Sequence, residues 1–115
     1  MKIFDRIILT AAVCATGALT VNAEVTDWYP ETVENRPFVR WWWLGSAVDK
    51  EGITYNLEEF AKKGLGGVEI TPIYGVQGNE ANDIIYLSDK WMDMLAHNIA
   101  EAKRLGLQID MNNGT

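Results

Sequence analysis

Residues 67–73, GVEITPI, form the most informative segment for the fold of this chain. The apolar side chains of Val68 and Ile70 alternate with Glu69 and Thr71, and this period of two predicts a β-strand with one apolar face and one polar face. A parallel strand covered by helices on both faces is apolar throughout its length. The segment therefore indicates a sheet that is buried on one face only.

Two more strands are predicted on either side of this segment. Residues 38–44 are aromatic and β-branched, FVRWWWL, and Gly45 ends them. Residues 107–111, LQIDM, again alternate apolar with polar side chains. In the first of these strands the alternation places Trp42 on the face opposite to Trp41 and Trp43.

Two helices are predicted between the strands, each from a capping residue and an apolar stripe at helical spacing. Asp49 caps the first helix, and Gly64 follows its end. Its stripe consists of Ile53, Leu57, Phe60 and Ala61. Ser88 caps the second helix, and Gly106 ends it. Its stripe is predicted to consist of Met92, Leu95, Ile99 and Ala102.

The order strand, helix, strand, helix, strand predicts an α/β fold with parallel strands and right-handed crossovers. A doubly wound sheet and a (β/α)₈ barrel of the TIM type both begin this way. One polar face on the second and third strands favours the barrel, whose lumen lies below an active site. Such a barrel takes about 250 residues, so residues 38–115 are expected to supply its first three β/α units as a truncated fragment. A sheet with one solvated face is the alternative.

The first 23 residues resemble a secretory signal peptide. Lys2 and Arg6 precede an apolar run that ends at a small-residue cleavage site. A lipoprotein signal using Cys14 and an uncleaved anchor are the alternatives. We therefore expect an exported protein, periplasmic or extracellular, without stable membrane insertion after cleavage. Residues 24–37 are polar and contain prolines, which predicts an extended leader before the fold.

Composition excludes several kinds of function. The net charge of −6 argues against a nucleic-acid partner, which needs a basic surface. Cys14 is the one cysteine and falls in the predicted signal, and His97 is the one histidine, so no zinc site is predicted. The glycine-rich residues 64–67 precede a strand and do not open a helix, which argues against a phosphate-binding loop.

Aromatic, amide and carboxylate groups gather where the predicted strands end, the position of active sites in β/α barrels. This mixture suits sugars, because aromatic rings stack on the apolar faces of pyranoses and the polar groups bind hydroxyls. Glu69 and Asp110 are candidate carboxylates for glycoside hydrolysis, which uses two of them. The preferred interpretation is that they organise hydrogen bonds, or bind a cation, without acting as the catalytic pair.

Four blocks, in this order, resemble the start of the catalytic barrel of glycoside hydrolase family 106, the α-L-rhamnosidases. They are RP and RWWWLG within residues 36–45, GLGGVEITPIYG at 64–75, LSDKW at 87–91 and EAKRLGLQIDMNNGT at 101–115. The resemblance implies an exported, Ca²⁺-dependent, inverting hydrolase that releases terminal α-L-rhamnose from plant polysaccharides. Its catalytic glutamates are expected beyond Thr115, and the fragment alone is expected to be inactive.

The resemblance also implies which residues bind substrate or support its binding. They are Arg40, Trp42, Trp43, Glu69, Tyr74, Asn112 and Asn113. No metal ligand is predicted among them. Another exported barrel glycosidase with a different sugar, and a non-catalytic carbohydrate-binding protein, remain the alternative functions.

Overall fold

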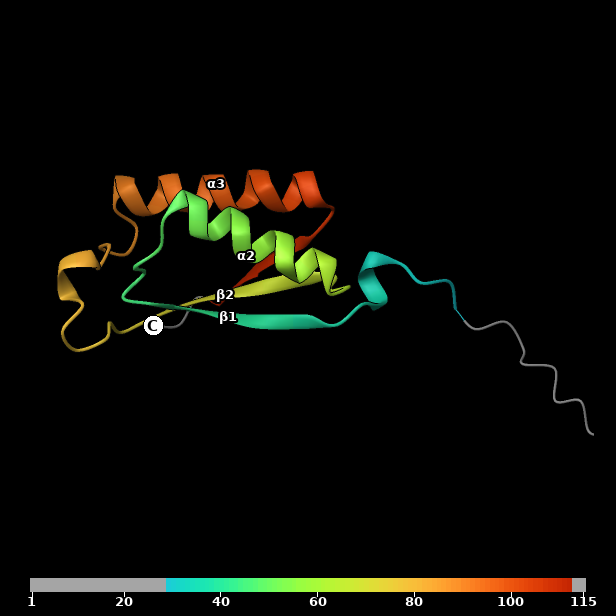
Figure 1. Cartoon of the computed structure of the whole chain (residues 1–115), viewed down its shortest axis with the longest axis horizontal. Helices are drawn as coiled ribbons and strands as arrows, with labels where there is room; N and C mark the ends of the chain where they lie inside the picture. Colours follow the sequence, from blue (N-terminus) through green and yellow to red (C-terminus); the bar gives the residue numbers. More distant parts are fainter. Residues whose placement is uncertain (1–28, 113–115) are drawn as a thin grey trace, which may run out of the picture.

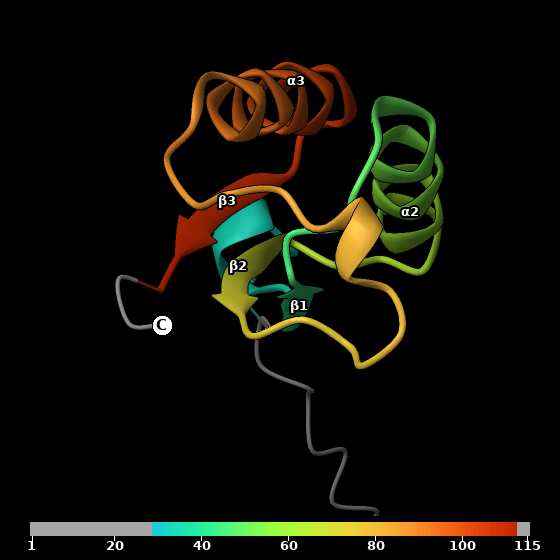
Figure 2. The ribbon, with the colours of Figure 1, turned by 90° about the vertical axis from the view of Figure 1, so that its left-hand side faces the viewer.

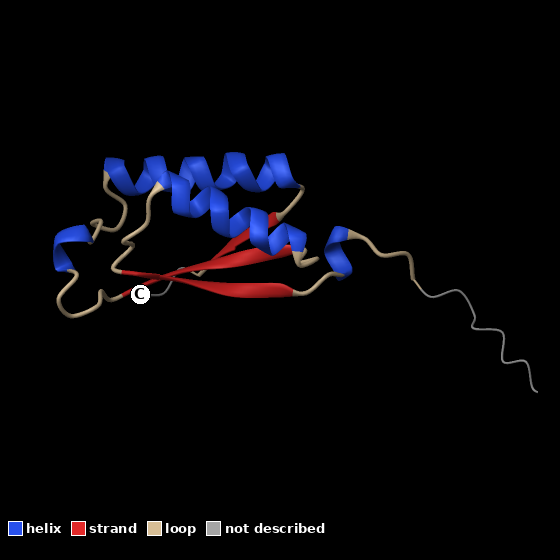
Figure 3. Cartoon of the chain, viewed as in Figure 1, coloured by secondary structure: helices blue, strands red, loops and turns tan. Residues whose placement is uncertain are grey.

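The computed structural model describes residues 29–112, which form a parallel sheet with two helices packed on one of its faces (Figure 1). Figure 3 shows the same two layers coloured by secondary structure. The elements, in chain order, are η1 (Val33–Asn35), β1 (Phe38–Leu44), α2 (Lys50–Lys62), β2 (Gly67–Ile73), η2 (Glu80–Asn82), α3 (Asp89–Leu105) and β3 (Gln108–Met111). The predicted α/β class and the order of its elements are confirmed.

The strands lie in the order β1-β2-β3, and both neighbouring pairs are parallel. Figure 2 shows α2 and α3 together on one face of this sheet, leaving the other face without a helix. The register aligns Arg40 with Glu69 and Glu69 with Asp110. We call this helix-free side the open face; it carries Phe38, Arg40, Trp42, Glu69, Gln108 and Asp110.

Both helices begin at the predicted caps. The Asp49 side chain accepts a hydrogen bond from the backbone N–H of Gly52 at 2.7 Å, and Ser88 accepts one from Trp91 at 3.3 Å. These bonds satisfy backbone donors that have no partner inside the helix. Gly106 ends α3 in the left-handed region, with φ of 70°.

Aromatic rings in edge-to-face contact form the centre of the core between the sheet and the helices. Phe60 of α2 contacts Trp41 with ring centroids 5.6 Å apart, and Trp41 contacts Trp43 at 5.8 Å. Trp43 contacts Trp91 of α3 at 6.0 Å, and Trp91 contacts Tyr86 at 4.9 Å. The first strand is thus joined to both helices by a continuous row of rings.

The predicted apolar stripe of α3 was right at Leu95 and Ala102 and wrong at Met92 and Ile99. Met92 and Ile99 are 47% and 50% exposed. The buried residues of α3 are Trp91, Met94, Asn98 and Ala102. Asn98 explains the error, because a fully buried asparagine interrupts the apolar pattern of the true face; its amide has no partner among the described residues.

The predicted signal peptide, residues 1–23, lies outside the described residues, so export stays a prediction. Within residues 29–112 no helix has the length and apolar character needed to cross a membrane. The predicted leader, residues 24–37, is described only from Tyr29 onward, where it contains the short helix η1. Three strands and two helices agree with the start of a barrel, and closure into a barrel stays a prediction.

Candidate functional site

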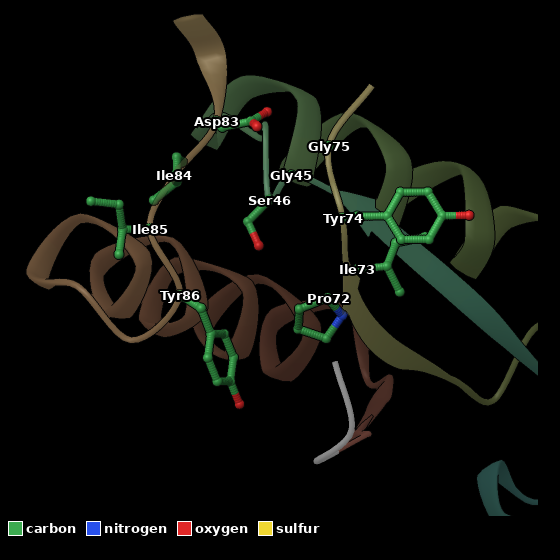
Figure 4. Close-up of a pocket in the computed structure, with 10 residues that line it drawn as sticks. All are labelled: Gly45, Ser46, Pro72, Ile73, Tyr74, Gly75, Asp83, Ile84, Ile85 and Tyr86. Carbon is green, nitrogen blue, oxygen red and sulfur yellow. The ribbon is translucent and has the colours of Figure 1, made fainter. Parts of the chain in front are cut away.

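A pocket of about 440 Å³ lies where β1 and β2 end, at the edge of the sheet to which their carboxyl ends point (Figure 4). Ligand sites in parallel α/β folds lie at this edge. It is lined by Gly45, Ser46, Pro72, Ile73, Tyr74, Gly75, Asp83, Ile84, Ile85 and Tyr86. These residues come from the turn after β1, the end of β2 and the long connection between β2 and α3.

The turn after β1 is built on two residues in the left-handed region, Gly45 with φ of 60° and Ser46 with φ of 50°. The Gly45 N–H donates to the carbonyls of Ile73 at 3.0 Å and Tyr74 at 3.1 Å. These bonds hold the end of β1 against the end of β2. The floor of the pocket is therefore fixed by backbone bonds between neighbouring strands.

The connection between β2 and α3 returns to the same turn and closes the pocket on a second side. The Ile84 N–H donates to the Gly45 carbonyl at 2.9 Å, and the Ile84 side chain is buried. Farther out, Glu80 accepts from the Gly78 N–H at 3.0 Å. This bond, with one from its own backbone N–H, holds the pKa of the Glu80 carboxyl below its ordinary value.

The carboxylate of Asp83 lies directly against two glycines of the pocket. A Cβ added at Gly45 or at Gly75 would overlap its oxygens. Figure 4 shows the carboxylate beside both backbones at one side of the pocket. The two glycines thus provide the space in which this acidic group is seated.

Ser46 connects the pocket to the core. Its hydroxyl accepts a hydrogen bond from the Trp91 indole N–H at 3.0 Å, and both residues are buried. Trp91 also packs against Tyr86, another residue of the pocket wall. The wall is therefore supported from behind by the aromatic core.

Replacing Ser46 with alanine is expected to lower the free energy of unfolding by about 1–3 kcal/mol, because the buried Trp91 N–H loses its acceptor. Thermal or urea unfolding of the full-length protein measures this effect. The control is a double-mutant cycle with Trp91→Phe, a background in which Ser46→Ala should cost much less. Equal costs in both backgrounds would show that the hydrogen bond contributes nothing.

Several predicted site residues lie together on the open face, on the neighbouring strands β1, β2 and β3. The Arg40 Nε donates to Glu69 Oε2 at 3.1 Å, and Asp110 is the register neighbour of Glu69 on β3. Trp42 is 52% exposed on the same face. An exposed ring beside an Arg–Glu pair is a surface that can stack on a sugar and bind its hydroxyls.

Trp43 requires a correction. Its side chain is 1% exposed and packs between Trp41 and Trp91 in the core, so it does not line the open face as a substrate-binding residue. Strand alternation is the reason, because Trp43 shares a face with Trp41 and not with Trp42.

Two more predicted residues, Tyr74 and Asn112, lie near the carboxyl ends of β2 and β3. Tyr74 is 83% exposed and lines the pocket. Asn112 follows β3, and its backbone N–H donates to the Ile70 carbonyl at 3.0 Å. Asn113 lies outside the described residues.

Sequence reasoning missed the four pocket residues 83–86, of which Asp83 and Tyr86 carry polar groups. Both lie in the connection between β2 and α3, far along the chain from the strand ends that identified the other candidates. The available signal was the run Asn82-Asp83 before an apolar pair, which a loop returning to the sheet would explain. Only the bond from Ile84 to Gly45 shows that the loop comes back to β1.

The calcium dependence that the family resemblance implies stays a prediction. Within residues 29–112 no three His, Cys, Asp or Glu side chains come together so that they could hold a metal ion. Calcium prefers six to eight oxygen ligands, including several carboxylates. No role in this part of the chain is therefore assigned to the ion that the family resemblance implies.

A parallel β/α unit with a pocket at its carboxyl edge has its ligand site where α/β and barrel enzymes have theirs, and tyrosines beside a carboxylate can bind a sugar. Comparison with known proteins gives the family. The family model Glyco_hydro_106, described as alpha-L-rhamnosidase, matches residues 29–114, and the chain belongs to this family.

Two similar proteins agree with this assignment to the glycoside hydrolases. A protein of Formosa agariphila named "Putative beta-glucuronidase" is 37% identical over 75 residues, which cover 64% of this chain. The solved structure of a rhamnosidase from Novosphingobium sp. PP1Y matches 71% of this chain with a TM-score of 0.59 and 25% identity. The matches span 6% of the first protein and 8% of the second.

Proposed function

We propose that this chain supplies the first three β/α units of the (β/α)₈ barrel of an exported α-L-rhamnosidase. The full-length enzyme hydrolyses terminal α-L-rhamnose from plant polysaccharides with inversion at the anomeric carbon. The observation that carries the proposal is the match of residues 29–114 to the α-L-rhamnosidase family. The fragment alone is inactive in this proposal, because the catalytic acid and base lie elsewhere in the enzyme.

The arrangement of the elements supports a barrel. The strands follow one another in space in chain order, and both crossover helices lie on the same face. A doubly wound sheet places helices on both faces, whereas a barrel keeps them on the outside. The pocket lies at the carboxyl ends of the strands, where barrel enzymes bind substrate.

On this proposal the open face becomes part of the barrel lumen, and its side chains bind the sugar. Arg40 and Glu69 bind hydroxyls and fix each other's orientation through their ion pair, while Trp42 offers a ring for stacking. Glu69 and Asp110 lie on neighbouring strands about 4.8 Å apart. The Glu69 carboxylate is already paired with Arg40, and the Asp110 carboxylate accepts a hydrogen bond from the Met111 N–H at 2.8 Å. Carboxylates engaged in this way suit supporting roles.

The test is hydrolysis of chromogenic glycosides by the full-length protein. An aryl α-L-rhamnoside should be cleaved, and the first sugar released should have the inverted anomeric configuration by proton NMR. Calcium dependence, which the described residues do not themselves explain, is tested by adding a chelator and restoring the ion. Cell fractionation tests export. Absence of rhamnoside hydrolysis would overturn the proposal.

A second candidate activity is β-glucuronide hydrolysis, favoured by the name of the Formosa agariphila relative. An aryl β-D-glucuronide is therefore assayed beside the rhamnoside at equal concentration. Preference for the glucuronide would replace the proposed substrate and keep the enzyme class. Binding of either sugar without hydrolysis would instead favour a carbohydrate-binding protein.

A further inference from the structure

We infer that Asp83 is a specificity-determining residue, whose carboxylate accepts hydrogen bonds from two neighbouring hydroxyls of the sugar bound in the pocket. The inference rests on the proposed function and adds to it a residue that binds the sugar.

The space that the Asp83 carboxylate occupies requires glycine at two positions that are far apart in the sequence. Gly45 follows β1 and Gly75 follows β2, and each presents its bare Cα to the Asp83 carboxylate. A methyl group at either position would occupy the place of the carboxylate oxygens. Both strand ends are thus shaped around this one acidic group.

Backbone hydrogen bonds hold the chain at Asp83, which restricts where its carboxylate can lie before a ligand arrives. The neighbouring Ile84 donates its N–H to the Gly45 carbonyl at 2.9 Å and buries its side chain. The Asp83 N–H itself donates to the Glu80 carbonyl at 3.2 Å. Groups fixed in advance lose little conformational entropy on binding, which favours affinity.

The carboxylate keeps its full capacity to accept hydrogen bonds. Among residues 29–112, no hydrogen bond or ion pair engages the Asp83 side chain, which is exposed at the pocket. An ionised carboxylate has two oxygens and accepts from two donors at once. Two hydroxyls on adjacent carbons of a pyranose match this arrangement.

The other side of the pocket is apolar. Pro72 and the ring of Tyr86 lie at the end of the pocket away from Asp83 in Figure 4. A 6-deoxy sugar such as rhamnose also has a polar side and an apolar side, because hydroxyls lie along one edge and a methyl group lies at the other. A uronic acid would instead bring a second carboxylate into the pocket, and like charges at short range repel each other. Asp83 therefore selects neutral deoxy sugars over uronic acids.

The experiment compares Asp83→Asn and Asp83→Ala with wild type in the full-length protein. KM and kcat are measured on an aryl α-L-rhamnoside, and L-rhamnose binding is measured by calorimetry. Both variants should weaken rhamnose binding by about 10- to 100-fold, the range for lost hydrogen bonds to a charged group. Asp89→Asn is the matched control, since Asp89 begins α3, is exposed and does not line the pocket; its binding should equal wild type.

The outcomes separate the residue from the function. If the wild type cleaves the rhamnoside and both Asp83 variants have the same KM, the role of Asp83 is overturned and the proposed function stands. A wild type that cleaves no rhamnoside overturns the proposed function. A loss of binding that only follows a lowered melting temperature would make Asp83 a structural residue and also overturn the inference. Gly75→Ala keeps the aspartate at position 83, but its added methyl group displaces the carboxylate. This variant should therefore also weaken rhamnose binding.

Discussion

Replacing Trp43 with alanine is expected to destabilise this part of the protein by about 3–5 kcal/mol, the range for removing a large buried aromatic side chain. Trp43 is 1% exposed and touches the rings of both Trp41 and Trp91. Its loss leaves a cavity between β1 and α3 that the two remaining rings cannot fill without leaving their rotamers. A marginally stable protein does not tolerate a change of this size well.

The adjacent Trp42 provides a matched control. Its ring is 52% exposed on the open face, so Trp42→Ala should change stability by less than about 0.5 kcal/mol. It should instead raise KM for an aryl α-L-rhamnoside by about threefold to tenfold, because a stacking surface is lost. Melting temperatures by fluorimetry and KM values are measured for both variants of the full-length protein. Equal falls in melting temperature would contradict the division of the tryptophans between two faces.

Local sequence patterns predicted most of the fold because their causes are local. The alternation of Val68 and Ile70 with Glu69 follows from strand geometry alone, and β2 has the predicted bounds, Gly67–Ile73. Asp49 and Ser88 begin their helices because a side-chain oxygen three residues before a backbone N–H can cap it in any context. No knowledge of tertiary contacts was needed for these features.

The remaining features depend on contacts between distant residues, which a local pattern does not contain. The buried face of α3 includes Asn98, so hydrophobic spacing selected a neighbouring face with Met92 and Ile99. The burial of Trp43 depends on the place of α3, because Trp91 of that helix packs against its ring. Asp83 became a candidate only when the loop before α3 was seen to return to Gly45.

The pocket and the core are coupled through a few shared residues. Ser46 lines the pocket and binds the Trp91 indole, and Tyr86 lines the pocket and packs on the same ring. Substitutions in the core near Trp91 should therefore change substrate affinity as well as stability. Substitutions on the open face, such as Trp42→Ala, should change affinity alone.

The substitution Gly45→Ala is expected to reduce kcat/KM for an aryl α-L-rhamnoside by about 10- to 100-fold, because its new methyl group displaces the Asp83 carboxylate. It also places alanine at φ of 60°, a left-handed conformation that costs roughly 1–2 kcal/mol. Gly64→Ala separates these effects: Gly64 has φ of 82°, and no atom lies within 4 Å of an added Cβ. Both variants should lose similar stability from the backbone, and only Gly45→Ala should lose activity. If both variants lost activity equally, Gly45 would be needed for its backbone conformation and not for the space that it leaves for the Asp83 carboxylate.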